Sequence, residues 1–340
     1  MRNVVLTAAL ALSTVTFVGC TANNGLTDPE GATGASALSG AGETGDDNNG
    51  MQENANDDSS NLGTPIVTAP VPPGTPPTTP PTPPKPCVRT TTTHAGYDQL
   101  PKTITVGTAT RKYLLVVPGD YDNCKKYPLV LALHGDGDTG THFHTWMAFE
   151  SASKSEAILM YPDGANNTWS LTAEPAVNAD IQFLNAAIAA TGKSYTLDAA
   201  KLYVTGFSSG AFMSNALACQ ESSMVRAIAS NSGGAPFNQK QKWTATGWDK
   251  CVGQAPVATL HIHGGADTTV NTSSGRFAAQ YWASVNGCAT TMSATSNSAC
   301  KTYDKCPAGK AVEYCEVPGM IHSEWEQTPA VAWAFFKAQQ

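Results

Sequence analysis

The sequence predicts an α/β fold in residues 87–340, with a mostly parallel central sheet and helices on both faces. Two observations carry this prediction: short, continuously apolar runs of strand length recur along the region, and stretches of helix length lie between them. Continuous apolar runs are typical of strands that are buried on both faces of a parallel sheet. About 250 residues is also a natural size for one such domain.

The elements alternate along the chain. The expected strands cover residues 113–118, 127–133, 157–161, 202–205 and 257–262. The expected helices cover residues 180–188, 211–219 and 329–336. Since sheets of this kind carry their sites in the loops that follow the carboxyl ends of the strands, the polar residues just beyond each strand are the candidates for function.

The first 86 residues are expected to lie outside the domain. Residues 1–19 resemble a secretory signal peptide, with Arg2 before an apolar run over 4–18 that is too short for a membrane span. The run ends in Phe17-Val18-Gly19-Cys20, which resembles a bacterial lipobox and predicts a lipid on Cys20. An ordinary signal peptide with a stray cysteine is the alternative. Residues 20–86, acidic and then rich in Pro and Thr, are expected to form a disordered spacer.

The formal net charge of −7 belongs to the spacer. The spacer carries eight acidic residues against Lys85 alone, which leaves 18 basic and 19 acidic residues in 87–340. A nearly neutral domain argues against nucleic acid as a partner, because phosphate contacts need a basic face. The export signal and the lipobox predict a location outside the cytoplasm, at the bacterial cell surface or outer membrane, where only the lipid anchor holds the chain. The chain is also expected to be a monomer.

Apart from Cys20, eight cysteines remain, all in residues 87–340. An even count behind an export signal predicts four disulfides formed in an oxidising compartment. Proximity along the chain favours the pairs Cys87–Cys124, Cys219–Cys251, Cys288–Cys306 and Cys300–Cys315, and leaves other pairings open. Zinc is disfavoured because no Cys-x-x-Cys pair is present.

The motif with the most specific chemistry is Gly206-Phe207-Ser208-Ser209-Gly210. It follows an expected strand and opens an expected helix, which is the context of a nucleophile elbow. The turn is so tight that the residues two positions either side of the nucleophile must be small, and the strained backbone exposes the hydroxyl. The motif therefore predicts the α/β-hydrolase fold with Ser208 as its nucleophile. A Gly-rich turn without chemistry is the alternative.

A serine hydroxyl needs a base to take its proton, and the base needs a carboxylate to orient it. In this fold the acid and then the histidine follow the serine along the chain. Asp267 lies just past the strand at 257–262, and His322 lies in a late loop before the last helix, so these two are predicted to complete a triad. The weaker candidates are the strand-end residues His261 and His263 and the carboxylates Asp249 and Asp304.

The tetrahedral intermediate of acyl transfer needs two backbone N–H donors for its oxyanion. The amide of Ser209 is one candidate, and the loop after the 127–133 strand supplies Gly135 or Asp136 as the other. His142 and His144 stand at His-x-His spacing but without a carboxylate cluster, so no metal and no cofactor are predicted.

Several motifs in order along 87–340 resemble one esterase family. They are Arg111-x-Tyr113-x-x-x-Val117-Pro118, Tyr121-Asp122, Tyr127-Pro128-Leu129-Val130-x-x-Leu133-His134-Gly135, Trp169, the elbow, Leu217-Ala218-Cys219, His263-Gly264-x-x-Asp267, Asn286-Gly287-Cys288 and Gly319-x-x-His322. Together they resemble the family of feruloyl esterases, acetylxylan esterases and polyhydroxybutyrate depolymerases. The resemblance implies the same triad of Ser208, Asp267 and His322. Trp169 and Trp325 are expected beside the site as aromatic walls of a substrate pocket, with half-buried core tryptophans as the alternative.

The sequence therefore predicts a secreted serine esterase that forms an acyl-enzyme and acts on an ester substrate, possibly a polymer. In cysteine density and in the region from Asn286-Gly287-Cys288 to Cys315 the chain more closely resembles the feruloyl esterases. The resemblance implies feruloyl or acetylxylan esters of plant cell walls as substrates, and a polyester such as polyhydroxybutyrate is the alternative. An acyltransferase and a catalytically inactive surface-binding protein are the rivals from other classes.

Overall fold

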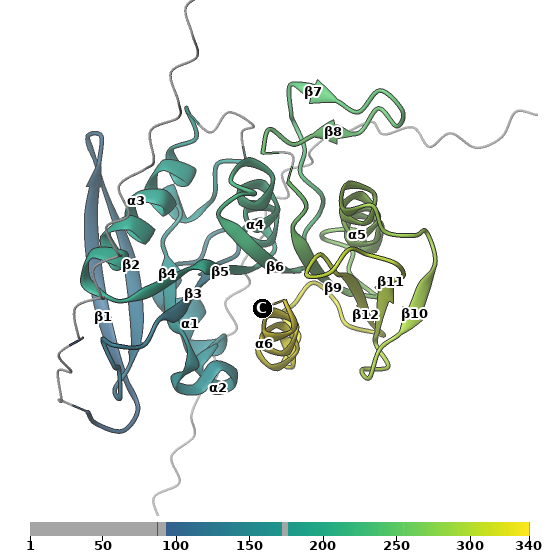
Figure 1. Ribbon diagram of the computed structural model, residues 1–340. Helices are drawn as coiled ribbons and strands as arrows, with labels where there is room; N and C mark the ends of the chain where they lie inside the picture. Colours follow the sequence, from purple (N-terminus) through teal and green to yellow (C-terminus); the bar gives the residue numbers. More distant parts are fainter. Residues whose placement is uncertain (1–86, 88–92, 172–175, 254, 340) are drawn as a thin grey trace, which may run out of the picture. The chain divides into compact units, whose positions relative to one another are not determined.

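The computed structural model describes residues 87, 93–171, 176–253 and 255–339. The predicted signal peptide, Cys20 and the spacer lie outside the described residues, and with them the domain boundaries remain predictions. Within the described part, a large sheet forms the centre of the fold and helices cover both of its faces (Figure 1).

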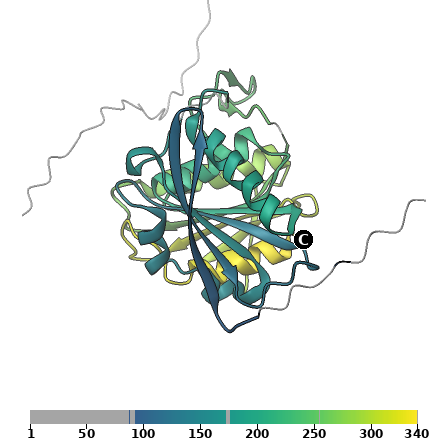
Figure 2. The ribbon, with the colours of Figure 1, turned by 90° about the vertical axis from the view of Figure 1, so that its left-hand side faces the viewer.

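The ten strands of the central sheet lie in the order β1-β2-β4-β3-β5-β6-β9-β12-β11-β10. The middle strands, from β4 to β12, run parallel to one another. Antiparallel strands extend the sheet at both ends. Viewed from its end, the sheet has a pronounced twist, as is expected when each strand is rotated relative to its hydrogen-bonded neighbour (Figure 2).

The strands of this sheet are β1 (Tyr97–Val106), β2 (Ala109–Pro118), β3 (Tyr127–Leu133), β4 (Ile158–Pro162), β5 (Leu197–Phe207), β6 (Val225–Asn231), β9 (Ala258–Gly264), β10 (Met292–Ala294), β11 (Cys300–Tyr303) and β12 (Val312–Val317). A separate pair, β7 (Gln241–Lys242) and β8 (Asp249–Lys250), lies in the long connection between β6 and β9. The helices are α1 (Gly140–Trp146), α2 (Glu150–Ser153), α3 (Ala179–Ser194), α4 (Ser209–Gln220), α5 (Thr272–Asn286) and α6 (Thr328–Ala338), with short 3-10 turns at Lys154–Glu156 and Ala165–Asn167.

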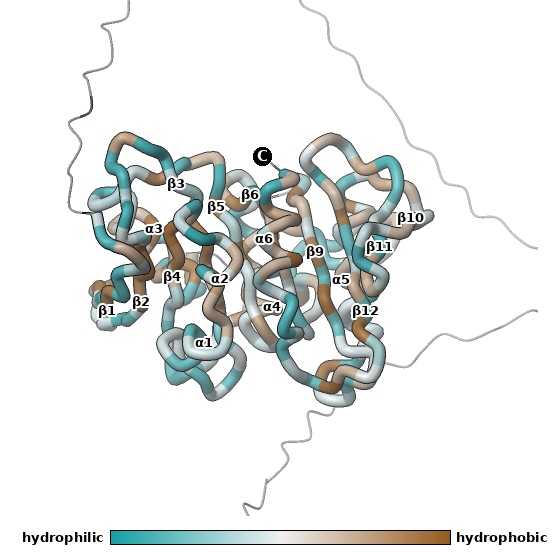
Figure 3. The backbone as a smooth tube through the Cα atoms, turned by 90° about the horizontal axis from the view of Figure 1, so that it is seen from below, coloured by the Kyte–Doolittle hydropathy of each residue, from teal (hydrophilic) through white to brown (hydrophobic). Residues whose placement is uncertain are grey.

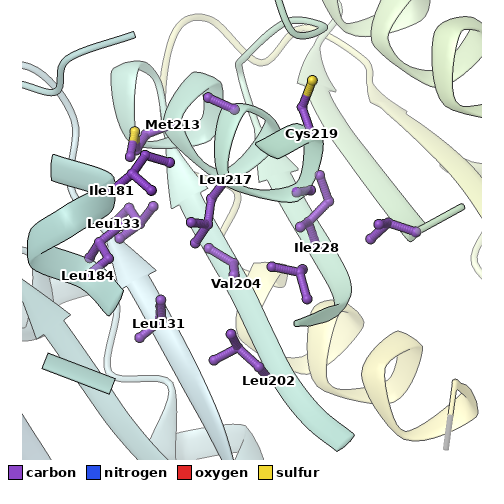
Figure 4. Packing of buried hydrophobic residues seen from close by; sticks show 14 of the residues in the cluster. Leu131, Leu133, Ile181, Leu184, Leu202, Val204, Met213, Leu217, Cys219 and Ile228 are labelled. Atoms are coloured by element: carbon purple, nitrogen blue, oxygen red, sulfur yellow. The ribbon is translucent and has the colours of Figure 1, made fainter. Parts of the chain in front are cut away.

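Two apolar cores hold the layers together, one on each face of the sheet. Helices α3, α4 and α5 bury side chains such as Ile181, Leu217 and Trp282 against one face, and Figure 4 shows the first two of these helices packed on β3, β5 and β6. Helices α1, α2 and α6 cover the other face, where Phe149 and Phe336 lie in the second core. Figure 3 looks onto this face and shows apolar stretches running along β4 and β9.

The predicted α/β-hydrolase fold is confirmed. All five expected strands occur, as β2, β3, β4, β5 and β9, and all three expected helices occur, as α3, α4 and α6. The central sheet also contains five strands that were not expected from the sequence: β1, β6, β10, β11 and β12. Strands β1, β10 and β11 lie at or next to the edges of the sheet and are mostly half-buried or exposed, so they lack a continuous apolar run. Strand β6 is central and buried, but Arg226, Ser230 and Asn231 interrupt its apolar residues.

Four disulfides join the eight cysteines of the domain: Cys87–Cys124, Cys219–Cys251, Cys288–Cys306 and Cys300–Cys315. These are the pairs that proximity along the chain favoured. Cys300 and Cys315 face each other directly across β11 and β12, whereas Cys219–Cys251 joins the end of α4 to the segment after β8. Among the described helices, none is long and apolar enough to cross a membrane.

Candidate active site

Ser208 stands at a sharp turn between β5 and α4, as the elbow motif predicts. Its backbone has φ 53° and ψ −119°, in the left-handed half of φ space that non-glycine residues rarely adopt. A Cβ on Gly206 would overlap the carbonyl oxygen of Gly210, and a Cβ on Gly210 would overlap that of Leu133. The two glycines therefore allow the strand, the turn and the helix to approach closely enough to hold this strained conformation.

The structure brings the three predicted triad side chains together at the carboxyl ends of β5, β9 and β12. His322 Nε2 lies 2.9 Å from Ser208 Oγ, and His322 Nδ1 lies 2.8 Å from Asp267 Oδ2. These are ordinary hydrogen-bond lengths. With Nδ1–H donating to Asp267, Nε2 is left to accept the serine proton, which is the arrangement that a general base requires.

The Asp267 carboxylate is fixed on both of its oxygens. Oδ2 accepts from His322, while Oδ1 accepts from the backbone amides of Thr269 (2.9 Å) and Val270 (3.0 Å). Burial raises the pKa of this carboxyl, but the hydrogen bonds from His322, Val270 and Thr269 outweigh burial and hold the pKa below its ordinary value. Asp267 therefore stays ionised at neutral pH and can stabilise a positive charge on the imidazole.

The alternative histidines of β9, His261 and His263, are both buried. His263 Nε2 donates to the carbonyl oxygen of Val270 (2.9 Å), and burial lowers the pKa of His263, so the ring stays neutral beside Asp267. Burial lowers the pKa of His261 to about 3. The alternative carboxylates also have other contacts: Asp249 pairs with Lys242 next to α5, and Asp304 accepts from Thr291 and Ser293 near β10.

The loop after β3 lies against the nucleophile. A Cβ on Gly135 would lie 3.1 Å from the Phe207 ring and 3.5 Å from Ser208 Cβ. The next two amides of this loop, those of Gly137 and Asp138, donate to the carbonyl oxygens of Asn167 and Gly135. The amides of Gly135 and Asp136 thus remain the candidates for an oxyanion donor on this side.

Ser209 supplies the candidate donor on the other side. It is the first residue of α4, where backbone N–H groups have no acceptor inside the helix. The helix N-terminus also favours a negative charge. The geometry therefore fits an oxyanion held between α4 and the β3 loop.

Trp169 and Trp325 are not walls of an open pocket. Trp169 is only 5 % exposed; its Nε1–H donates to the carbonyl oxygen of His134 (2.9 Å), and its ring packs on the His134 ring. His134 in turn accepts from the Gly164 amide, so Trp169 supports the β3 loop from within. Trp325 is 8 % exposed and belongs to the core under α6. For both residues the alternative of a core tryptophan is nearer to what the structure shows than the predicted pocket wall. The prediction was wrong because a tryptophan in a loop has no sequence periodicity that reveals which way its side chain faces.

The aromatic side chains that do lie beside the triad were not singled out from the sequence. The Phe207 ring lies 5.0 Å from the His322 ring, and the Trp146 ring meets Phe207 edge-on at 6.0 Å. Trp146 is 49 % exposed and Ile321, next to His322, is 65 % exposed. The only sequence signal for Phe207 was its place inside the elbow motif, and Trp146 had none.

Within the described ranges, no group of three or more His, Cys, Asp or Glu side chains is placed to hold a metal ion. His142 pairs with Asp138 and His144 with Glu150, each at 2.7 Å. The two histidines of the His-x-His pattern thus have separate carboxylate partners.

The fold and these contacts define an α/β-hydrolase with Ser208, His322 and Asp267 in the places where this fold carries its triad. The family model for phospholipases and carboxylesterases matches residues 165–305, which include Ser208 and Asp267. Among solved structures, the acetyl xylan esterase from Aspergillus awamori superposes with a TM-score of 0.55 at 18% identity, over 69% of this chain and 99% of that one.

Proteins with similar sequences include feruloyl esterases. The chain is 32% identical to feruloyl esterase C of Emericella nidulans and to the probable feruloyl esterase C of Aspergillus terreus, in each case over 184 residues. These alignments cover 52% of this chain and 63% of each relative, so the chain spans less than two thirds of the relatives' length. Feruloyl esterase B of Piromyces equi is 24% identical over 248 residues, 67% of this chain and 45% of that protein.

Proposed function

We propose that this protein is a serine carboxylic-ester hydrolase that acts through an acyl-enzyme on feruloyl or acetyl esters of plant cell-wall polysaccharides. The observation that carries the proposal is the unbroken chain of hydrogen bonds from Asp267 through His322 to Ser208. The similarity to feruloyl esterases over 184 residues supports the substrate class.

The geometry suits two successive acyl transfers. Ser208 Oγ attacks the ester carbonyl carbon while its proton passes to His322 Nε2, and Asp267 stabilises the imidazolium that forms. The amides of Ser209 and of the β3 loop hold the oxyanion. The imidazolium then protonates the leaving alcohol. A water molecule then attacks the acyl-enzyme carbonyl carbon while its proton passes to His322 Nε2. The imidazolium protonates Ser208 Oγ as the acid is released, which restores Ser208.

The surroundings of the triad support a substrate with an aromatic acyl group. Phe207 and the exposed Trp146 provide ring surface on the α1 side of His322. Aromatic rings of this kind attract other rings in edge-on or offset arrangements. The same exposed surface, together with Ile321, also suits an apolar polymer, so a polyester depolymerase is the second candidate.

We further propose that the protein works outside the cytoplasm, tethered through a lipid on Cys20. Four disulfides suit an oxidising compartment. Incorporation of labelled fatty acid into the wild type and into a Cys20→Ala variant tests the anchor. Equal labelling of the two would contradict it.

Labelling with a fluorophosphonate probe tests the reaction class. The wild type and the matched Ser209→Ala variant should be labelled, and Ser208→Ala should not. Failure of the wild type to react would favour a surface-binding protein. Initial rates on methyl ferulate, acetylated xylan, p-nitrophenyl acetate and polyhydroxybutyrate then rank the substrates, and ester products formed with added alcohols would reveal an acyltransferase.

A further inference from the structure

Glu324 lies two residues after His322 in the loop between β12 and α6, and the reaction described above does not use it. Its carboxyl is turned into the protein. Oε2 accepts a hydrogen bond from Asn231 Nδ2 at 2.5 Å. Oε1 is buried and has no hydrogen-bond partner within the part of the chain that the structure describes. A buried polar atom without a partner is costly, which suggests that something other than stability retains it.

Asn231 connects this carboxyl to the nucleophile. It is the last residue of β6, the strand that lies between β5 and β9 in the sheet. Its backbone carbonyl oxygen accepts the N–H of Ser208 at 3.0 Å. Its side-chain amide also donates to Thr328 Oγ1, at the start of α6, at 3.0 Å. The Glu324–Asn231 contact therefore joins the loop that carries His322 to the backbone that holds Ser208.

We propose that Glu324 is a positioning residue: its carboxyl ties the His322 loop to the strand end beneath Ser208 and sets the alkaline limit of the activity. The proposal rests on the esterase function proposed above and adds a regulation of that site by pH. Glu324 does not touch the reacting atoms. It acts by keeping His322 Nε2 within hydrogen-bond distance of Ser208 Oγ.

Burial raises the pKa of Glu324 to about 8, against the smaller lowering effects of the neighbouring Asn231 and Thr328 side chains. The carboxyl is therefore neutral at pH 7 and ionises as the pH rises through about 8. An ionised carboxylate here would have Oε1 buried without a hydrogen-bond partner, although Glu324 as a whole is half-buried, and an outward movement of the loop would solvate it. Such a movement carries His322 away from Ser208.

Among the described residues, no other titratable group of the surrounding elements pairs with Glu324, and this includes Glu313 of β12, which lies beside Ala330 and Val331 of α6. On the loop, His322 bonds Asp267 and Ser208, and Glu326 is exposed. On β9, His263 packs against Gly275 of α5 and His261 follows the same alternation, so both face the side of the sheet opposite α6. The remaining charged groups of β6 and α6 are Arg226, which donates to the carbonyl oxygen of Gln339, and Lys337, which pairs with Glu156. None of them offers Glu324 a charged partner.

The test is the pH dependence of kcat and kcat/KM for p-nitrophenyl acetate between pH 6 and 10. In the wild type, activity should fall above pH 8, by about tenfold per pH unit once the carboxyl is ionised. Glu324→Gln keeps a neutral acceptor for Asn231, so it should retain activity at pH 7 within about threefold and lose the fall near pH 8. The matched control Glu326→Gln, in the same loop but exposed, should follow the wild type. An alkaline limb that is identical in the wild type and Glu324→Gln would overturn the proposal.

A measurement on the wild type covers the case in which Glu324→Gln does not fold. With glutamate ¹³C-labelled at the side-chain carboxyl, one resonance should titrate with a midpoint near pH 8. Absence of any glutamate titrating between pH 7 and 9 would likewise overturn the proposal. If the protein hydrolyses none of the esters, the rate of fluorophosphonate labelling of Ser208 replaces turnover as the readout. Failure of the proposed function is thereby separated from failure of this inference.

Discussion

Replacing Asp267 by Asn tests the orientation of the histidine. Asp267 Oδ1 accepts two backbone amides, so the oxygen of an asparagine amide must occupy that position. The NH₂ group then faces His322 Nδ1, which is 2.8 Å from Oδ2 in the wild type. To avoid two donors facing each other, the imidazole must place its proton on Nε2. In that tautomer His322 donates toward Ser208 and can no longer accept its proton.

The loss should be large because the general base is disabled while the geometry is kept. A wrong histidine tautomer of this kind costs about 10³–10⁴-fold in kcat, equivalent to about 4–5.5 kcal/mol of transition-state stabilisation. Steady-state hydrolysis of p-nitrophenyl acetate at pH 7.5 measures it, with circular dichroism to check folding. Asp304→Asn is the matched control and should stay within about twofold of the wild type. An Asp267→Asn variant with more than a tenth of wild-type kcat would refute the assignment.

Three further predictions concern the elbow, the aromatic surface and the sheet. Gly210→Ala, where a methyl group would overlap a backbone carbonyl, should lower the free energy of unfolding by about 2 kcal/mol or more in urea titrations. Gly192→Ala lies within α3, where a Cβ would make only an ordinary van der Waals contact with Leu197 Cδ1 at 3.7 Å, so it should instead raise the free energy of unfolding by about 0.5–1 kcal/mol; equal effects would contradict the steric argument. Trp146→Ala should lower kcat/KM for methyl ferulate about tenfold and leave kcat/KM for p-nitrophenyl acetate within about twofold of the wild type. The distant Phe277→Ala should change neither value. An equal loss on both esters in Trp146→Ala would rule out an aromatic subsite. Because the pKa of His261 is lowered in the folded state to about 3, the unfolded state binds the extra proton first and stability is lost as the pH falls from about 6.5 toward 3; His261→Gln should shift the acid-unfolding midpoint to lower pH, and an unchanged midpoint would exclude His261 as a cause.

The parts of the site that the sequence revealed are those with local steric rules. The elbow could be recognised because both glycines are sterically required: Gly206 by its contact with Gly210 within the motif, and Gly210 by its contact with Leu133 at the end of β3. The strand over 127–133 could be recognised because burial on both faces leaves only apolar residues. Asp267 and His322 followed from chain order once the elbow was identified, and the structure brings both to Ser208.

The parts that the sequence concealed depend on which way a side chain turns in a loop or at the end of a short helix. Trp169 turns inward to bond the β3 loop, whereas Trp146 turns outward beside Phe207, although neither sits in an informative pattern. Glu324 reads as an ordinary surface glutamate ahead of a helix. Only the structure shows that its Oε1 is buried and that its Oε2 contacts Asn231, 93 residues earlier in the chain. Short edge strands such as β10 were missed because half-exposed strands do not need apolar residues.

The Cys219–Cys251 bridge encloses part of the sheet that holds the nucleophile. Its two cysteines are 32 residues apart, and the segment between them contains β6, the connection in which Phe237 meets Phe212 of α4, and β7 and β8. A cross-link of this span removes conformational entropy worth about 3–4 kcal/mol from the unfolded chain, so the bridge stabilises the folded state by restricting the unfolded one. Reduction of this bridge is therefore expected to lower the free energy of unfolding by an amount of that order.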